Sequence, residues 1–108
     1  MARFPCPYLN ADVELTEERE RHIAERHPDF LPEHRDRVAD VLADPDAVLR
    51  DADYPSTRLF CRWFEGLIEG KHVVAAVVSD PSPAVRHWII TAFISRKPPK
   101  GDVEWKRP

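Results

Sequence analysis

The segment at residues 88–94 constrains the fold most, because it is the most apolar run in the C-terminal half of the chain and carries one hydroxyl, Thr91, at its centre. A short apolar run of this length is typical of a buried strand. Side chains alternate between the two faces of a strand. We therefore expect two sets of side chains on opposite faces: Trp88, Ile90, Ala92 and Ile94 on one, and His87, Ile89, Thr91, Phe93 and Ser95 on the other.

Two helices are expected before the strands, after an extended lead-in at residues 8–15. Thr16 is a typical N-cap residue, and acidic residues follow it in the first turn, where they are favoured. The helix should end near His27, because Pro28 disfavours helical geometry in the residue before it. A second helix is expected over residues 32–44, with a buried stripe made by Val38, Val41 and Leu42.

From position 46 the apolar pattern has a period of two, which indicates strands. Strands are expected at 47–50 and 57–64, and an edge strand at 103–105. The unbroken apolar run at 73–78 is typical of a central strand covered on both faces. The order of elements favours one α+β domain over residues 1–108, with two N-terminal helices packed on one face of a four- to five-stranded antiparallel sheet.

The alternation within the strands predicts which side chains face the helices. The predicted core positions on the sheet are Leu59, Cys61, Trp63, Val74, Ala76, Val78, Trp88, Ile90 and Ala92. They should pack against Ile23 and the stripe of the second helix. The opposite, open face then receives arginines, aromatic rings, a histidine and a hydroxyl: Arg58, Phe60, Arg62, Phe64, His87, Thr91 and Phe93.

The net charge of −3 conceals an asymmetry. Residues 1–56 carry 7 basic and 14 acidic side chains, whereas residues 57–108 carry 9 basic and 5 acidic ones. This split is equally compatible with a solvated acidic helical surface beside an ordinary sheet and with a basic sheet that attracts a polyanion.

Short motifs spread over residues 20–106 are His22-Ile-x-x-Arg26-His-Pro28, Leu42-x-x-Pro45-Asp46, Leu59-Phe-x-Arg62, the run at 73–78, Thr91-Ala-Phe93 and Lys100-Gly-x-x-x-Trp105. In their order and spacing they resemble the phage-type members of the barnase, EndoU, colicin E5/D and RelE-like nuclease superfamily. The resemblance implies two helices on a four- or five-stranded sheet and metal-independent cleavage of RNA. It also implies roles for a helix histidine, a strand arginine and Thr91. The chain differs from the toxic members in being acidic overall.

Metal-independent cleavage of RNA needs a base for the 2′-hydroxyl, a cation for the developing charge and an acid for the leaving 5′-oxygen. Histidine serves in either proton-transfer role. The candidate catalytic residues are His22, His27, Arg62 and Thr91. The candidate substrate-binding residues are Arg58, Phe60, Lys71, His87 and Phe93. The sequence does not decide which of the two helix histidines acts.

Other interpretations stay open. Each histidine alone is also typical of a surface or cap position, and the open-face phenylalanines are compatible with a second hydrophobic layer. A zinc site of His22, His27 and His34 is disfavoured, because the spacing does not place two of them one helical turn apart. The non-enzymatic alternative is a small module that binds RNA or a protein. A nuclease requires a helix histidine close to Arg62 and Thr91, whereas a scattered trio favours the binding module.

The remaining expectations concern location and partners. No apolar stretch has the length of a signal peptide or a membrane span, so we expect a cytoplasmic protein. Cys6 and Cys61 are far apart and unpatterned, which favours a buried thiol at Cys61 over a disulfide or a metal ligand. No cofactor is expected. RNA is the expected partner, an inhibitor protein is compatible with the resemblance, and no pattern specifies the oligomeric state.

Overall fold

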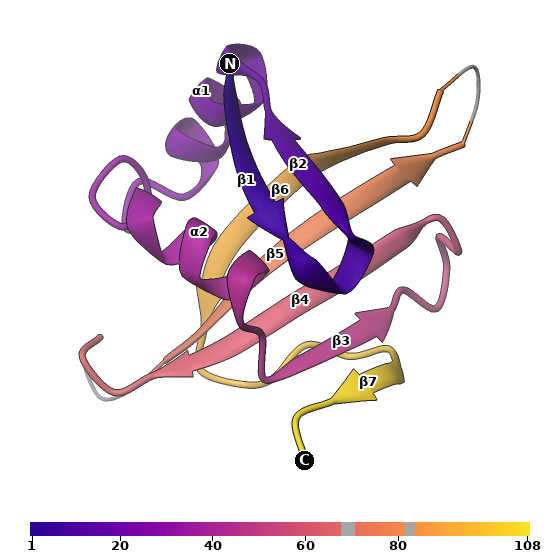
Figure 1. Ribbon diagram of the computed structural model, residues 1–108. Coiled ribbons are helices and arrows are strands. Elements are labelled where there is room, and N and C mark those ends of the chain that lie inside the picture. The colour runs from indigo at the N-terminus through magenta and orange to yellow at the C-terminus, as the bar shows by residue number, and fades with distance from the viewer. Residues whose placement is uncertain (68–70, 82–83) are drawn as a thin grey trace.

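The computed structural model describes residues 1–67, 71–81 and 84–108 (Figure 1). The connections between the expected strand at 57–64, the run at 73–78 and the segment at 88–94 lie partly outside the described residues. In chain order the elements are β1 (Ala2–Cys6), the 3-10 helix η1 (Pro7–Leu9), β2 (Ala11–Leu15), α1 (Glu17–Arg26), α2 (Arg35–Ala43), β3 (Ala47–Arg50), β4 (Thr57–Phe64), β5 (Lys71–Asp80), β6 (Arg86–Ser95) and β7 (Asp102–Lys106). No helix within the described ranges is long and apolar enough to cross a membrane.

The α+β class is confirmed, but the sheet is larger than expected. Seven strands lie in the order β1-β2-β6-β5-β4-β3-β7, and all neighbours are antiparallel except β2 and β6, which are parallel. The prediction of four to five strands was wrong because the expected lead-in folds as a hairpin. Its chain reversal follows η1, where Asn10 takes a left-handed conformation with φ 53°. The helices therefore lie between two strand segments rather than at the N-terminus.

The β1–β2 hairpin belongs to the sheet through β2, but it folds over the same side of β3–β6 as both helices do (Figure 1). We call this side the helix face. The tip of the hairpin reaches β4 and β7. The ring of Tyr8 lies 5.9 Å from that of Phe60 and 6.1 Å from that of Trp105, measured between centroids. Its hydroxyl donates a hydrogen bond to Glu104 Oε1 at 2.7 Å. Tyr8 thus joins the tip of the β1–β2 hairpin, at one edge of the sheet, to β7 at the other edge.

The main core fills the space between the helix face and the elements that cover it. The helix positions expected to be buried are confirmed: Ile23, Val38, Val41 and Leu42 are each at most 1% exposed. The strands contribute Phe4, Val13, Leu15, Val48, Phe60, Phe64, Val73, Ala75, Val77, Ile89 and Ala92.

The predicted faces of β4 and β5 were reversed. Phe60 is fully buried on the helix face, whereas Trp63 is 42% exposed on the opposite, open face. In β5, Val73 and Val77 belong to the main core, and Val74 belongs to a second cluster on the open face. Arginines alternate with the phenylalanines on this face of β4, and such a polar pattern by itself predicts a solvent-facing surface. Arginine stems pack on apolar surface while their head groups find partners at its edge.

The predicted faces of β6 were correct only in part, because a β-bulge interrupts its alternation. Ala76 pairs with Thr91, and the next residue, Val77, pairs with Ile89, so Ile90 is the extra residue. Ala92 faces the helices as expected. The burial expected for Trp88 and Ile90 was wrong, since Trp88 is half-buried and Ile90 is 36% exposed.

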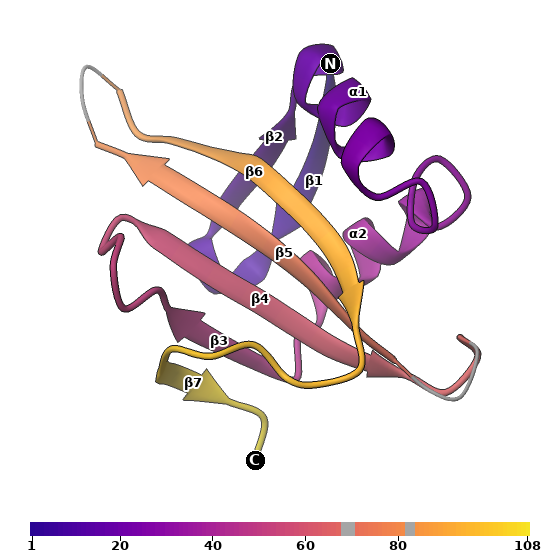
Figure 2. The same ribbon diagram turned by 180° about the vertical axis from the view of Figure 1, so that it is seen from behind.

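The connection between β6 and β7 crosses the open face, because these strands lie in different parts of the sheet (Figure 2). Pro98, Pro99 and Gly101 line a hollow together with Leu49 and Cys61 of the open face. We call residues 97–101 the strap. Beneath it lies the small second cluster of Leu49, Cys61 and Val74. Cys61 is a buried free thiol, as expected.

Candidate functional site

Helix α1 carries three basic side chains on one side. Thr16 caps the helix, since its hydroxyl accepts a hydrogen bond from the Arg19 amide at 3.2 Å. Arg19, His22 and Arg26 follow at intervals of three and four residues, the spacing of neighbours on one helical face. Ile23, 1% exposed, anchors the helix in the core. The basic face is thereby directed to the edge of β6.

The edge of β6 forms the opposite wall. β2 pairs with β6 between Glu14 and Trp88. The chain then leaves the sheet and enters α1, which packs beside β6. The bulge places the consecutive residues Ile90 and Thr91 on this wall. A regular strand would direct them to opposite faces.

These two walls enclose an open hollow of about 450 Å³, which we call the basic hollow. Its lining consists of Arg19, His22, Arg26, His27, Ile90 and Thr91. His27 is the C-cap of α1, and its amide donates to the Ile23 carbonyl at 2.7 Å. The His27 ring lies 5.7 Å from the ring of Phe93, measured between centroids. This contact places the imidazole between the helix end and β6.

The electrostatics of the basic hollow favour an anion. None of its lining residues is acidic. Within the described part of the chain, no carboxylate pairs with the guanidinium of Arg19 or Arg26. The neighbouring acids Glu18 and Glu25 lie farther round the helix, in a second hollow that Arg19 and His22 also line. Two guanidinium groups, two imidazoles and a hydroxyl around one space can hold a phosphate and exchange protons with it.

A second hollow of about 630 Å³ adjoins the first on the open face, and we call it the apolar hollow. Ile90 and Thr91 line both. Its walls come from β4, β5 and β6, from the β3–β4 loop and from the strap, with Leu59, Ala76, Val78, Phe93, Tyr54 and Pro99 among the lining residues.

The structure brings together three of the four predicted catalytic residues. His22, His27 and Thr91 line the basic hollow, and the predicted binding residue Phe93 stands beside it. Arg62 does not line it. The helix histidines and Thr91 therefore lie apart from Arg62, which is the scattered arrangement expected of a binding module. The cations of this hollow come from α1 instead.

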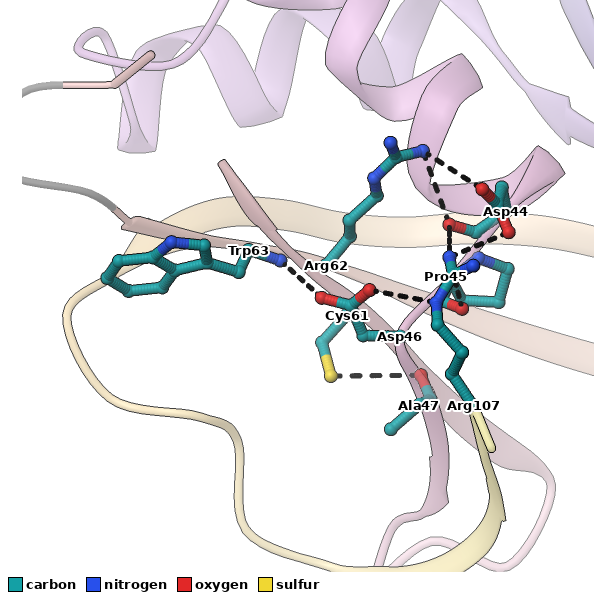
Figure 3. A network of polar contacts seen from close by, with 8 residues as sticks. All are labelled: Asp44, Pro45, Asp46, Ala47, Cys61, Arg62, Trp63 and Arg107. Carbon is teal, nitrogen blue, oxygen red and sulfur yellow. Dashed lines mark hydrogen bonds and ion pairs between the residues drawn. The ribbon is translucent and has the colours of Figure 1, made fainter. Parts of the chain in front are cut away.

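Arg62 lies on the helix face and belongs to a different network (Figure 3). Its Nη1 lies 3.6 Å from Asp44 Oδ2, and its guanidinium carbon lies 5.2 Å from the centroid of the Phe64 ring. Arg107 binds the same carboxylate at 2.7 Å and also contacts Asp46. Asp46 Oδ2 accepts a hydrogen bond from the Trp63 amide at 2.8 Å. The network joins the end of α2 to β4 and to the C-terminal segment.

Arg58 was expected on the open face, but it lies in a polar network on the helix face. Its Nε donates to Glu104 Oε1 at 2.8 Å, and Arg50 Nε donates to Oε2 at the same distance. Partial burial alone would raise the pKa of the Glu104 carboxyl. Hydrogen bonds from Arg58, Tyr8 and Arg50 outweigh this effect and lower that pKa to about 2.

The structure also removes Phe60 and His87 from the predicted open face. Phe60 is fully buried in the main core. His87 is 9% exposed, and its Nδ1 lies 2.6 Å from Ser79 Oγ. Burial, and after it the charge of Arg58, lowers the pKa of His87 below its ordinary value of 6.5. A buried neutral imidazole of this kind supports the fold rather than contacting a large substrate.

Two other predicted positions lie away from the basic hollow. Lys71 begins β5 and pairs with Phe64 of β4. His34 lines a separate hollow on α2 with Glu33 and Asp36, so the three histidines weighed as a zinc site do not share one space.

Arg19 and Arg26 are the residues that sequence reasoning missed. They belong to the acidic half of the chain, whereas the predicted cations Arg58 and Arg62 belong to the basic half. Their spacing with His22 is visible in the sequence and was the available signal. Most arginines of the basic half are instead held by carboxylates, as Arg58, Arg62, Arg86 and Arg107 are.

Comparisons with known proteins add no further constraint on this site. No protein-family model, curated protein or solved structure matches the chain, so the assignment rests on the residues and geometry of the two adjoining hollows.

Proposed function

We propose that the chain is a metal-independent RNA endonuclease whose active site is the basic hollow. The observation that carries the proposal is the convergence of His22, His27 and Thr91 with two arginines that pair with no carboxylate of the described residues, all in one open space. The resemblance to the nuclease superfamily supports the roles of a helix histidine and Thr91, whereas Arg19 and Arg26 of α1 take the place of its strand arginine in this proposal. Acid–base groups and cations are the two components that this reaction requires.

In the proposed reaction a phosphodiester of RNA occupies the basic hollow. Arg26 and Arg19 bind its non-bridging oxygens, and the Thr91 hydroxyl donates to one of them. His27 takes the proton of the 2′-hydroxyl, and the 2′-oxygen forms a bond to phosphorus. The bond to the 5′-oxygen breaks, and His22 gives that oxygen its proton. The products are a 2′,3′-cyclic phosphate and a 5′-hydroxyl.

The division of roles between the histidines follows their surroundings. His27 is half-buried and fixed against Phe93, which holds one orientation for proton abstraction. His22 is exposed and lies on the solvent side, where a leaving group departs. The developing negative charge falls between the two guanidinium groups, and a preorganised cation stabilises the transition state more than the bound substrate.

The first prediction tests this site with mixed RNA in the presence of EDTA. Purified protein should yield fragments that end in 2′,3′-cyclic phosphate. His27→Ala should lower the cleavage rate roughly 10²- to 10⁴-fold, the usual effect of a lost general base. Arg26→Ala should lower it roughly 10²- to 10³-fold, as for the loss of one group that stabilises developing charge.

Arg21→Ala is the matched control, because Arg21 is an exposed arginine of the same helix that does not line the basic hollow. It should leave the rate within about twofold of wild type. Arg62→Ala should also retain the rate per folded molecule, in contrast to the expectation from sequence. If RNA binds in a salt-dependent manner yet stays intact between pH 5 and 8, a non-catalytic RNA-binding module replaces the nuclease. Cleavage that EDTA abolishes would contradict the metal-independent mechanism.

A further inference from the structure

The strap and β7 lie side by side at one edge of the open face (Figure 2) and border a hollow of about 470 Å³, which we call the strap hollow. Leu49 and Cys61 of the second cluster form its floor. Pro98 and Pro99 of the strap and Val103 of β7 also line it. Among the described residues, none lines both this hollow and the basic hollow. The strap hollow is therefore a separate, mainly apolar site.

A β-bulge in β7 directs two of its side chains into the strap hollow. The register of β7 on β3 shifts between Val103 and Trp105, which leaves Glu104 as the extra residue. Val103 and Lys106 stand three positions apart, and a regular strand would direct them to opposite faces. Here both line the hollow. Val103 is 62% exposed, so its apolar surface is open to a partner.

The strap hollow is positively charged. Lys100 of the strap and Lys106 of β7 line it, and no acidic residue among the described ones does so. Within the described part of the chain, neither lysine pairs with a carboxylate. Arg50 of β3 and Arg58 of β4 are instead held by Glu104. Ammonium groups from both the strap and β7 thus flank the apolar floor. This arrangement favours an apolar group that has negative charge on either side of it.

The strand β7 also offers main-chain partners, because it is the last strand of the described sheet. All of its residues are exposed. The side chain of Glu104 is only 22% exposed, so the exposure of this residue comes from its backbone. Unpaired N–H and C=O groups of an edge strand bind extended peptides. At the opposite edge, β1 contains Pro5, which lacks an N–H donor. The β7 edge is therefore the better edge for an extended segment.

We propose that the strap hollow is a docking site for a protein partner, which contributes an extended segment with a large apolar residue between acidic residues. The apolar side chain lies between Pro99 and Val103, over Cys61. The acidic side chains bind Lys100 and Lys106, and the backbone of the segment runs along the edge of β7. A fatty acid would supply one carboxylate and no amide, and a nucleic acid strand would supply no aliphatic side chain. The docking site is independent of the proposed nuclease function, because it lies outside the basic hollow.

The test uses a short synthetic peptide with blocked ends, in which a leucine lies between two pairs of glutamates. In one control peptide lysines replace the glutamates, and in another serine replaces the leucine. Calorimetric titration of the wild-type chain gives the affinities. The acidic leucine peptide should bind at least about 10-fold more tightly than the lysine peptide, because the two lysines of the hollow attract the former and repel the latter. It should bind roughly 5-fold more tightly than the serine peptide, the effect of partly burying one apolar side chain.

Amide resonances in NMR spectra show where the peptide binds. The acidic leucine peptide should shift the amides of the strap and of β7. The amides of α1, which carries the basic side of the other hollow, should stay in place. Pentathymidylate, a DNA strand with as many negative charges as the peptide, is the probe for a nucleic acid at the same site. It should shift the strap and β7 amides only weakly.

Charge reversal tests the roles of the two lysines. Lys100→Glu and Lys106→Glu should each lower the affinity for the acidic leucine peptide roughly 5-fold, because one attraction becomes a repulsion. Both positions are exposed, so the fold should persist. Lys97→Glu is the matched control, since Lys97 is an exposed lysine of the strap that does not line the strap hollow. It should leave the affinity within about twofold of wild type. Val103→Ser should narrow the difference between the leucine and serine peptides.

Four results would overturn the docking site. The first is the absence of binding by the acidic leucine peptide, or equal affinities for it and the lysine peptide. The second is unchanged affinity in both Lys100→Glu and Lys106→Glu. The third is a set of shifted amides confined to α1 and β6, which would place the peptide in the basic hollow. The fourth is binding of pentathymidylate at the strap and β7 as tight as that of the peptide, which would assign the hollow to a nucleic acid.

Discussion

Phe60 and Trp63 stand three positions apart on β4, yet their side chains lie in opposite environments. Phe60 is fully buried beside Tyr8, whereas Trp63 is 42% exposed and makes an edge contact with His72 at 4.9 Å. Phe60→Ala should lower the free energy of unfolding by about 3–5 kcal/mol, the cost of a large cavity in the core. Trp63→Ala should lower it by less than about 1.5 kcal/mol, the range of one exposed aromatic contact.

Urea unfolding of both variants measures these differences through their midpoints and slopes. A larger loss for Trp63→Ala than for Phe60→Ala would reverse the two faces of β4. That ranking follows from the face of β4 that was predicted from the sequence to be buried.

The strap depends on a close approach of its last residue to β3. A Cβ atom built on Gly101 would lie 2.7 Å from the Arg50 carbonyl oxygen and 3.4 Å from Leu49 Cβ. The first contact is with backbone, so the two segments must separate to admit a side chain. Gly101→Ala should therefore lower the free energy of unfolding by about 1–3 kcal/mol, as for other overpacked positions.

Gly66→Ala is the control for the same chemical change. Its Cβ would meet only the end of the Arg37 side chain, at 3.7 Å, which is ordinary contact. The free energy of unfolding of Gly66→Ala should stay within about 1 kcal/mol of the wild-type value. A small increase is favoured, because alanine reduces the conformational freedom of the unfolded chain. Hydrogen exchange should show faster exchange of β3 and β7 amides in Gly101→Ala alone. Unchanged exchange there would show that the strap adjusts without moving β7.

The closure of the whole molecule depends on Glu104, which joins the hairpin tip at Tyr8 to the arginines of β3 and β4. Its pKa is lowered from 4.5 to about 2 in the folded protein. A carboxyl with a lowered pKa stabilises the fold above its unfolded pKa, and this stabilisation is lost as the pH falls toward the folded value. Wild-type stability should decrease between about pH 5 and pH 2 for this reason.

Glu104→Gln should be less stable than wild type at pH 7 and should show a flatter dependence on pH below 5. Glu65→Gln, the same change at an exposed loop position, should follow the wild-type curve. Free energies of unfolding measured in urea from pH 2 to 7 give the comparison. Parallel curves for wild type and Glu104→Gln would show that the closure does not depend on the ionised carboxylate.

The sequence by itself determined the local elements from Thr16 onward, except for the start of α2, which lies at Arg35 rather than at position 32. Thr16, Pro28 and the apolar period located α1, and the change to a period of two located the strands from position 46 onward. These signals act through neighbouring residues: a cap satisfies amides of its own helix, and a proline restricts the residue before it. The resemblance and the chemistry of RNA cleavage named His22, His27 and Thr91, which line one hollow, and also Arg62, which lies elsewhere.

Only the tertiary structure decided which face of each strand is covered and which cations line the site. Alternation sorts β4 into two sets, but both contain large apolar residues, so the choice depends on what packs against them. The hairpin and helices cover Phe60, and carboxylates distant in sequence pair with Arg58 and Arg62. The bulge in β6 and the course of α1 along its edge are long-range outcomes of packing. They leave Arg19 and Arg26, rather than the strand arginines, facing the open hollow.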